Sequence, residues 1–131
     1  RFSYCGSRKS LMVTTKSMLP LTVYGEASGN YDGSSQDWVG DPVQAAEYYR
    51  GRGSIQTITV NTTDFVGTMY IEACLDTLSD SASWFTTFEY GDGSSQLTDR
   101  YTETVLGNFV WMRVRVAGFD GGTINSVTIS Y

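Results

Sequence analysis

The sequence predicts an all-β fold, an antiparallel two-sheet β-sandwich of jelly-roll type, and three observations support this prediction. The chain has 131 residues, which is the size of one domain. Apolar residues recur with a period of two in several runs, as they do in strands that bury one face. Eight β-rich runs alternate with turns that contain glycine, asparagine or aspartate. A small barrel is the alternative closure of the same strands.

The first segment of the chain is basic. Residues 1–16 carry four charges, all positive, whereas residues 17–131 carry five basic and fourteen acidic side chains, a net charge of −9. We expect residues 1–16 to be an N-terminal arm or a first strand that docks on an acidic neighbour, with an ordinary solvated terminus as the alternative. Residues 17–131 are expected to form the single sandwich domain. Their acidic surface argues against nucleic-acid binding, and no apolar run of the sequence is long enough for a membrane helix.

Residues 25–53 are predicted to form a long irregular loop, because they are rich in glycine and show little periodicity. A loop of this length inside a compact domain is usually functional or becomes ordered against a partner. Within it, residues 42–49 can form a short helix with Asp41 as N-cap and Pro42 at the first helical position. The loop also holds aromatic residues that either dock a partner or fold back as a lid on the core, namely Tyr31, Trp38, Tyr48 and Tyr49.

The clearest predicted strand covers residues 108–117. Its apolar residues alternate with Trp111, Arg113 and Arg115, so one face is buried and the other carries these three side chains. We expect the buried face of this strand to pack with apolar residues of other strands, the whole set being Val110, Met112, Val114 and Val116 with Ile58, Val60, Ile71 and Ile129.

Seven further strands are expected. Residues 68–75 also alternate, and Cys74 falls on the side opposite Met69, Ile71 and Ala73, which suggests that both faces of the sheet are covered there. The other predicted strands are residues 11–16, 19–24, 54–60, 84–90, 101–105 and 123–130. Turns are predicted at residues 92–93, 106–108 and 120–122.

The sequence contains no constellation that favours catalysis or a cofactor. It has no histidine, which excludes Ser-His and Cys-His nucleophile pairs and His-ligated metals. The close carboxylate pair Asp76 and Asp80 lies in a serine-rich turn, and the Asp-Gly turns lack the spacing of an EF-hand. We therefore expect neither an enzyme nor a metal protein. Cys74 is interpreted as a small buried residue, with a Cys5–Cys74 bridge as the alternative.

The outward side of residues 108–117 is the most distinctive candidate surface. Trp111, Arg113 and Arg115 form a stripe that is expected to contact a partner, with the arginines pairing carboxylates of an acidic neighbour. A tryptophan packed under a loop, or stacking on a sugar, is the alternative. The candidate interface residues are Arg8, Lys9, Tyr31, Trp38, Tyr48, Tyr49, Arg50, Arg52, Trp111, Arg113 and Arg115.

From about residue 45 to the end, the chain resembles a family of small β-sandwich virion proteins of tailed bacteriophages, T4-like phages and related cyanophages. The resemblance rests on the order and spacing of five segments, which are residues 48–49, 65–75, 84–85, 107–114 and 122–124. It implies a non-enzymatic structural protein of the virion that binds copies of itself and other virion subunits, on the capsid, neck or tail. A carbohydrate-binding module or adhesin, and a subunit of an extracellular bacterial filament, are the alternative functions.

Overall fold

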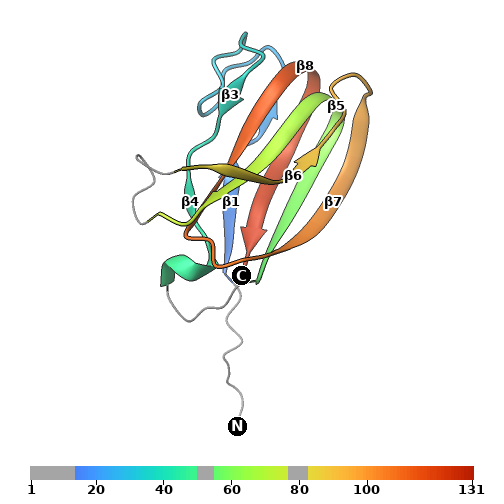
Figure 1. The fold of residues 1–131 in the computed structure, drawn as a ribbon. Coiled ribbons are helices and arrows are strands. Elements are labelled where there is room, and N and C mark those ends of the chain that lie inside the picture. Colours follow the sequence, from blue (N-terminus) through green and yellow to red (C-terminus); the bar gives the residue numbers. More distant parts are fainter. Residues whose placement is uncertain (1–13, 50–54, 77–82) are drawn as a thin grey trace.

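The computed structural model describes residues 14–49, 55–76 and 83–131, which form one antiparallel sheet of eight strands (Figure 1). The all-β prediction is therefore confirmed. A single turn of 3₁₀ helix, η1 (Ala46–Tyr49), is the one helical element in this part of the chain. The strands are β1 (Thr15–Leu19), β2 (Thr22–Val23), β3 (Trp38–Val39), β4 (Val43–Gln44), β5 (Ile55–Cys74), β6 (Phe85–Tyr90), β7 (Leu97–Leu106) and β8 (Trp111–Ser130).

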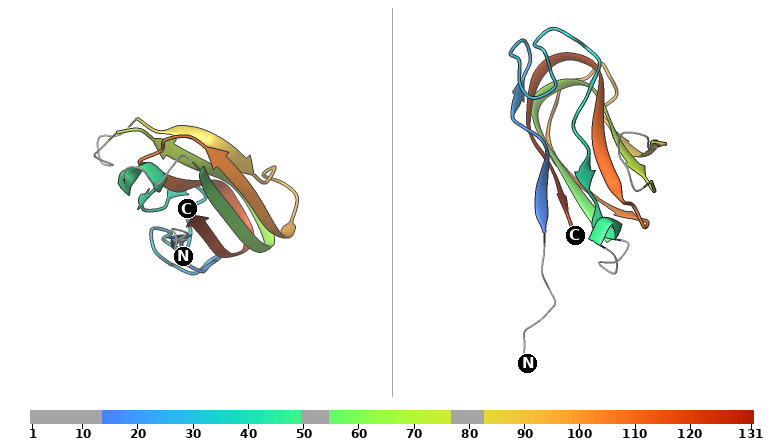
Figure 2. Two further views of the ribbon diagram at one scale, coloured as in Figure 1. Left: turned by 90° about the horizontal axis from the view of Figure 1, so that it is seen from below. Right: turned by 90° about the vertical axis from the view of Figure 1, so that its left-hand side faces the viewer.

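Two strands of 20 residues each, β5 and β8, form the centre of the sheet. They run antiparallel from Thr57 opposite Ser130 to Cys74 opposite Trp111. On the free side of β5, β7 pairs with its first part and β6 with its last part. On the free side of β8, β1 and β2 follow its C-terminal part, and β3 and β4 its N-terminal part. Both long strands arch strongly, so the sheet curves around the core (Figure 2).

The arch corrects two sequence predictions. Residues 55–60 and 68–74, which were expected in two separate strands, belong to the single strand β5. Residues 120–122 do not reverse the chain but lie inside β8. The register of β5 against β8 shifts on both sides of Val66, so the strands bend by irregular pairing without ending. Gly122 has a φ of 84°, and a Cβ there would lie 2.1 Å from the carbonyl oxygen of Asp64. Glycine at this position therefore permits the close approach of the two backbones.

The predicted core face is confirmed for seven of its eight residues. The set comprises Met112, Val114, Val116, Ile58, Val60, Ile71 and Ile129, each with no exposed surface. Val110 precedes β8 and is partly buried. The period-two pattern located this face correctly because alternate side chains of a strand lie on opposite sides of the sheet.

The first part of the predicted loop 25–53 is a lid on the core, which was one of the two alternatives. Tyr31 and Trp38 are 1% and 7% exposed and pack on Phe119, with ring centroids 5.2 Å and 6.3 Å from it. The Tyr31 hydroxyl accepts a hydrogen bond from the Gly25 amide at 3.0 Å. Within the isolated chain, these two aromatic residues offer no surface to a partner. Residues 50–53 lie outside the described part.

The predicted helix over residues 42–49 is shorter than expected. Val43 and Gln44 form β4 and pair with β8, and only residues 46–49 form η1. Asp41 is not a helix cap, since its carboxylate accepts a hydrogen bond from Asn30 instead. The Ala45 amide donates to the Val110 carbonyl at 2.8 Å, so sheet pairing takes the amides that a helix would need.

Candidate interaction face

The outer side of β5 and β8 carries the candidate site. Because Met112 and Val114 face the core, the alternate residues of β8 lie on the opposite side of the sheet. Antiparallel pairing places a residue of β5 directly opposite each of them, in the pairs Tyr70–Arg115, Glu72–Arg113 and Cys74–Trp111. We call these six residues, together with Trp84 and Tyr48, the arginine face.

Glu72 is the centre of the arginine face. Arg113 donates through Nε to Glu72 Oε1 at 2.7 Å, and Arg115 donates through Nε to Oε2 at 2.9 Å. Burial alone raises the pKa of the Glu72 carboxyl, but the hydrogen bonds and charges of Arg115 and Arg113 outweigh it and lower the pKa below its usual value. Glu72 is therefore ionised at neutral pH, and the three side chains carry a net charge of +1.

Each arginine also lies over an aromatic ring. The Arg113 guanidinium is 4.2 Å from the centre of the Trp84 ring, and that of Arg115 is 4.0 Å from the centre of the Tyr70 ring. The side chains of Arg113 and Arg115 remain 23% and 37% exposed. Within the described residues, their Nη groups have no recorded hydrogen bond. Both guanidinium groups are thus held in place, yet retain donors for a ligand.

An aromatic pair extends the arginine face towards η1. The rings of Tyr48 and Trp111 meet edge to face, with centroids 5.2 Å apart. Tyr48 is 39% exposed and Trp111 is partly buried. This end of the arginine face therefore presents apolar surface beside the two guanidinium groups.

The structure unites only some of the predicted interface residues. Tyr48, Trp111, Arg113 and Arg115 meet on the arginine face, whereas Tyr31 and Trp38 belong to the lid and pack into the core. The side chain of Tyr49, and the basic residues Arg8, Lys9, Arg50 and Arg52, lie outside the described part of the chain.

Sequence reasoning missed Tyr70, Glu72 and Trp84 as members of this face. A signal for the first two was present, since they alternate with the apolar residues of the 68–75 run. An acidic residue in one alternating run and two arginines in another suggest a cross-strand pair, but only the register between the strands shows that they are opposite each other.

Cys74 lies on the same outer side and is fully buried with a free thiol. Burial raises the pKa of this thiol, so it is protonated at neutral pH. The interpretation of Cys74 as a small buried residue is consistent with this environment. Cys5 lies outside the described residues.

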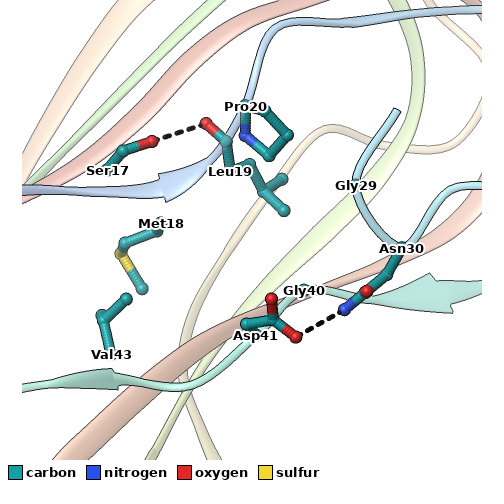
Figure 3. Close-up of a pocket in the computed structure, with 9 residues that line it drawn as sticks. All are labelled: Ser17, Met18, Leu19, Pro20, Gly29, Asn30, Gly40, Asp41 and Val43. Carbon is teal, nitrogen blue, oxygen red and sulfur yellow. Dashed lines mark hydrogen bonds between the residues drawn. The ribbon is translucent and has the colours of Figure 1, made fainter.

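A small cavity opens between the edge of β1 and the segment leading to β4 (Figure 3). Its volume is about 190 Å³, and Met18, Leu19 and Val43 supply its apolar walls. Asn30 and Asp41 are joined by a hydrogen bond of 2.9 Å at its rim. Ligand pockets usually measure about 300–1,000 Å³, so this cavity is small for an organic ligand.

Other kinds of site receive no support from the described residues. Asp76 accepts a hydrogen bond from the Ser83 amide at 2.7 Å, and Asp80 lies outside the described part. No group of three or more His, Cys, Asp or Glu residues suited to a metal ion occurs in residues 14–49, 55–76 and 83–131. The helical segment in these ranges is too short to cross a membrane. Comparison with protein-family models, curated proteins and solved structures found no match.

Proposed function

We propose that this protein is a non-enzymatic structural protein of a tailed-bacteriophage virion, present in many copies on the capsid, neck or tail, where it binds other protein subunits. The observation that carries the proposal is the arginine face. Tryptophan, tyrosine and arginine dominate the residues that contribute most to protein–protein binding, and here all three types share one partly exposed face. We propose the location in a phage virion from the resemblance of residues 45–131 to phage virion proteins.

The rigidity of the site supports a role in assembly rather than catalysis. Arg113 and Arg115 lie in the part of β8, residues 111–117, that pairs in regular register with β5, and Glu72 holds both guanidinium groups. A surface with fixed side chains loses little conformational entropy when a partner binds. The charge of the arginine pair favours partners that present carboxylates.

We also propose that the curved sheet is a two-sheet sandwich of jelly-roll type. In one half of the sheet, the first part of β5 and the last part of β8 lie between β7 and β1. In the other half, the last part of β5 and the first part of β8 lie between β6 and the short strands β3 and β4. Each half then contains four neighbouring antiparallel segments, and the first strand of the described residues, β1, lies beside the last, β8, as in a jelly roll. Such double-sheet folds form viral capsid and lectin domains. An experimental structure would test this description by the separation of the halves, about 10 Å across a sandwich core.

A carbohydrate-binding function is the second candidate, because Tyr48 and Trp111 form a partly exposed aromatic pair. Aromatic rings and arginine also suit stacking and hydrogen bonding to sugars. The two functions differ in what the arginine face binds, a protein surface or a glycan.

Localisation and glycan binding test these functions together. Antibody against the purified chain should label gradient-purified particles at a regular position in electron micrographs, and a glycan array should give no saturable binding. Saturable binding of one sugar, abolished by Trp111→Ala but retained in Tyr101→Phe, would favour the carbohydrate module. Labelling of cell-surface fibres without particles would favour a filament subunit.

A further inference from the structure

The charges of the described residues are unevenly distributed. Only Lys16, Arg100, Arg113 and Arg115 are basic among them. Several segments lie together at one end of the molecule (Figure 1). They are the loop between β2 and β3, the loop between β6 and β7, and the bends in the middle of β5 and β8. Each of these segments has acidic residues and no basic one. We call the exposed carboxylates of these segments the acidic end, and they are Glu26, Asp32, Asp37, Asp64, Asp92 and Asp120.

Two members of the acidic end lie in loops with the same sequence. Residues 32–36 and 92–96 both read DGSSQ, and in each loop the aspartate accepts hydrogen bonds from the amides two and three residues later. The hydrogen bond from the Ser34 amide is the main cause that lowers the pKa of Asp32 to about 2. For Asp92, the hydrogen bond from the Ser95 amide is the main cause that lowers the pKa to about 2. These carboxylates are therefore ionised at any physiological pH.

The arginine face is complementary to the acidic end in charge and in chemistry. Arg113 and Arg115 are two residues apart on one side of β8, about 6–7 Å along the strand. Their guanidinium groups are fixed by Glu72 and by Trp84 and Tyr70, and their Nη groups have no recorded hydrogen bond among the described residues. Guanidinium Nη donors bind carboxylates more strongly than neutral donors do.

We propose that the arginine face of one copy of this chain binds the acidic end of a second copy. This inference rests on the proposed function, since it names the partner of the same face. The two surfaces are different parts of the chain, so the contact is heterologous and leaves one arginine face and one acidic end available on each pair. Repetition of such a contact produces a closed ring or an open filament. A second copy can supply the carboxylates for this contact, because residues 17–131 carry fourteen acidic and five basic side chains.

The test uses two variants, each of which impairs one surface. Arg115→Gln impairs the arginine face, and the double variant Glu26→Lys with Asp120→Lys impairs the acidic end. Arg100→Gln, in β7, is the matched control because it removes an exposed arginine outside both surfaces. Circular dichroism and thermal melting would verify that each variant is folded. Arg115→Gln also removes the ion pair with Glu72, so it can change stability as well as binding. The acidic-end variant avoids this, because Glu26 and Asp120 are exposed and their side chains make no hydrogen bond to another described residue.

Sedimentation velocity over a concentration series gives the readout. At low salt the full wild-type chain and Arg100→Gln should form assemblies that grow with concentration, and 1 M salt, which screens charges beyond about 3 Å, should weaken them. Each impaired variant alone should associate at least about tenfold more weakly. A mixture of the two should form one-to-one dimers that stop growing, because each copy retains one intact surface.

Three results would overturn the inference. They are a wild-type chain that is monomeric at all concentrations at low salt, impaired variants that assemble like wild type, and a mixture that either remains monomeric or grows without limit. Antibody labelling of particles tests the virion function independently of this contact. A chain found in virions but monomeric in isolation would refute only this contact, whereas a self-assembling chain absent from virions would refute the virion function.

Discussion

Replacement of Glu72 by glutamine should destabilise the fold, because Arg113 and Arg115 would both lose their charged acceptor. A hydrogen bond to a charged group contributes about 1.5–3 kcal/mol when buried. The two arginine side chains are 23% and 37% exposed, so water compensates part of the loss. We therefore expect a loss of about 1–3 kcal/mol in the free energy of unfolding at pH 7. For a domain of this size that lowers Tm by about 4–10 °C.

The effect should depend on pH. The pKa of Glu72 in the folded chain lies below its ordinary value of 4.5. A carboxyl with a lowered pKa stabilises the folded state fully above its unfolded pKa, and this contribution is lost as the pH falls through the folded pKa. The difference in stability between wild type and Glu72→Gln should therefore be largest above pH 4.5 and shrink as the pH is lowered below it.

Chemical denaturation of both proteins at a series of pH values is the assay. Glu89→Gln is the matched control, because Glu89 is exposed and lies opposite Tyr70 in β6 without pairing to either arginine. The control should change the free energy of unfolding by less than about 0.5 kcal/mol. A Glu72→Gln protein as stable as wild type at pH 7, or a difference that does not vary with pH, would refute the account of Glu72 as the charged centre of this face.

Three further predictions concern the core, the lid and an exposed turn. Val114→Asp should cost several kcal/mol, because Val114 has no exposed surface and the carboxyl would be buried without a partner; a soluble variant with unchanged Tm would contradict the register of β8. Trp38→Ala should cost about 3–5 kcal/mol and make residues 25–44 of the monomer sensitive to protease, whereas wild type resists cleavage there; rapid cleavage of wild type in this range would contradict the lid. Carbon-detected NMR titration should give Asp92 a pKa of about 2, and Ser95→Pro, which removes the donating amide, should raise that pKa; an ordinary value in wild type would exclude the turn.

Some of this architecture followed from the sequence because it depends on neighbouring residues alone. The alternation from Met112 to Val116 was sufficient to predict which side of that strand is buried, since the side-chain period of a strand is two. The same alternation placed Trp111, Arg113 and Arg115 together on the other side. The all-β class followed from the number of such runs and from the scarcity of helix signals.

Other features were decided by contacts between distant segments. Residues 120–122 have the composition of a turn, yet they continue β8, because β5 bends beside them and the Asp64 backbone lies against Gly122. Residues 43–44 pair with β8 and are therefore not part of the predicted helix. Tyr31 and Trp38 have the composition of a docking surface, but Phe119 offers them a place to pack within the chain itself.

The candidate site shows the same division. The sequence by itself determined that Arg113 and Arg115 lie on the outer side of a strand, because that depends only on alternation. Only the tertiary structure decided that Glu72 binds both of them, because strand register is set by the packing of the whole core and by the irregular pairing around Val66. A shift of one residue would turn Glu72 to the other face of the sheet, and the two arginines would lose the carboxylate that orients them.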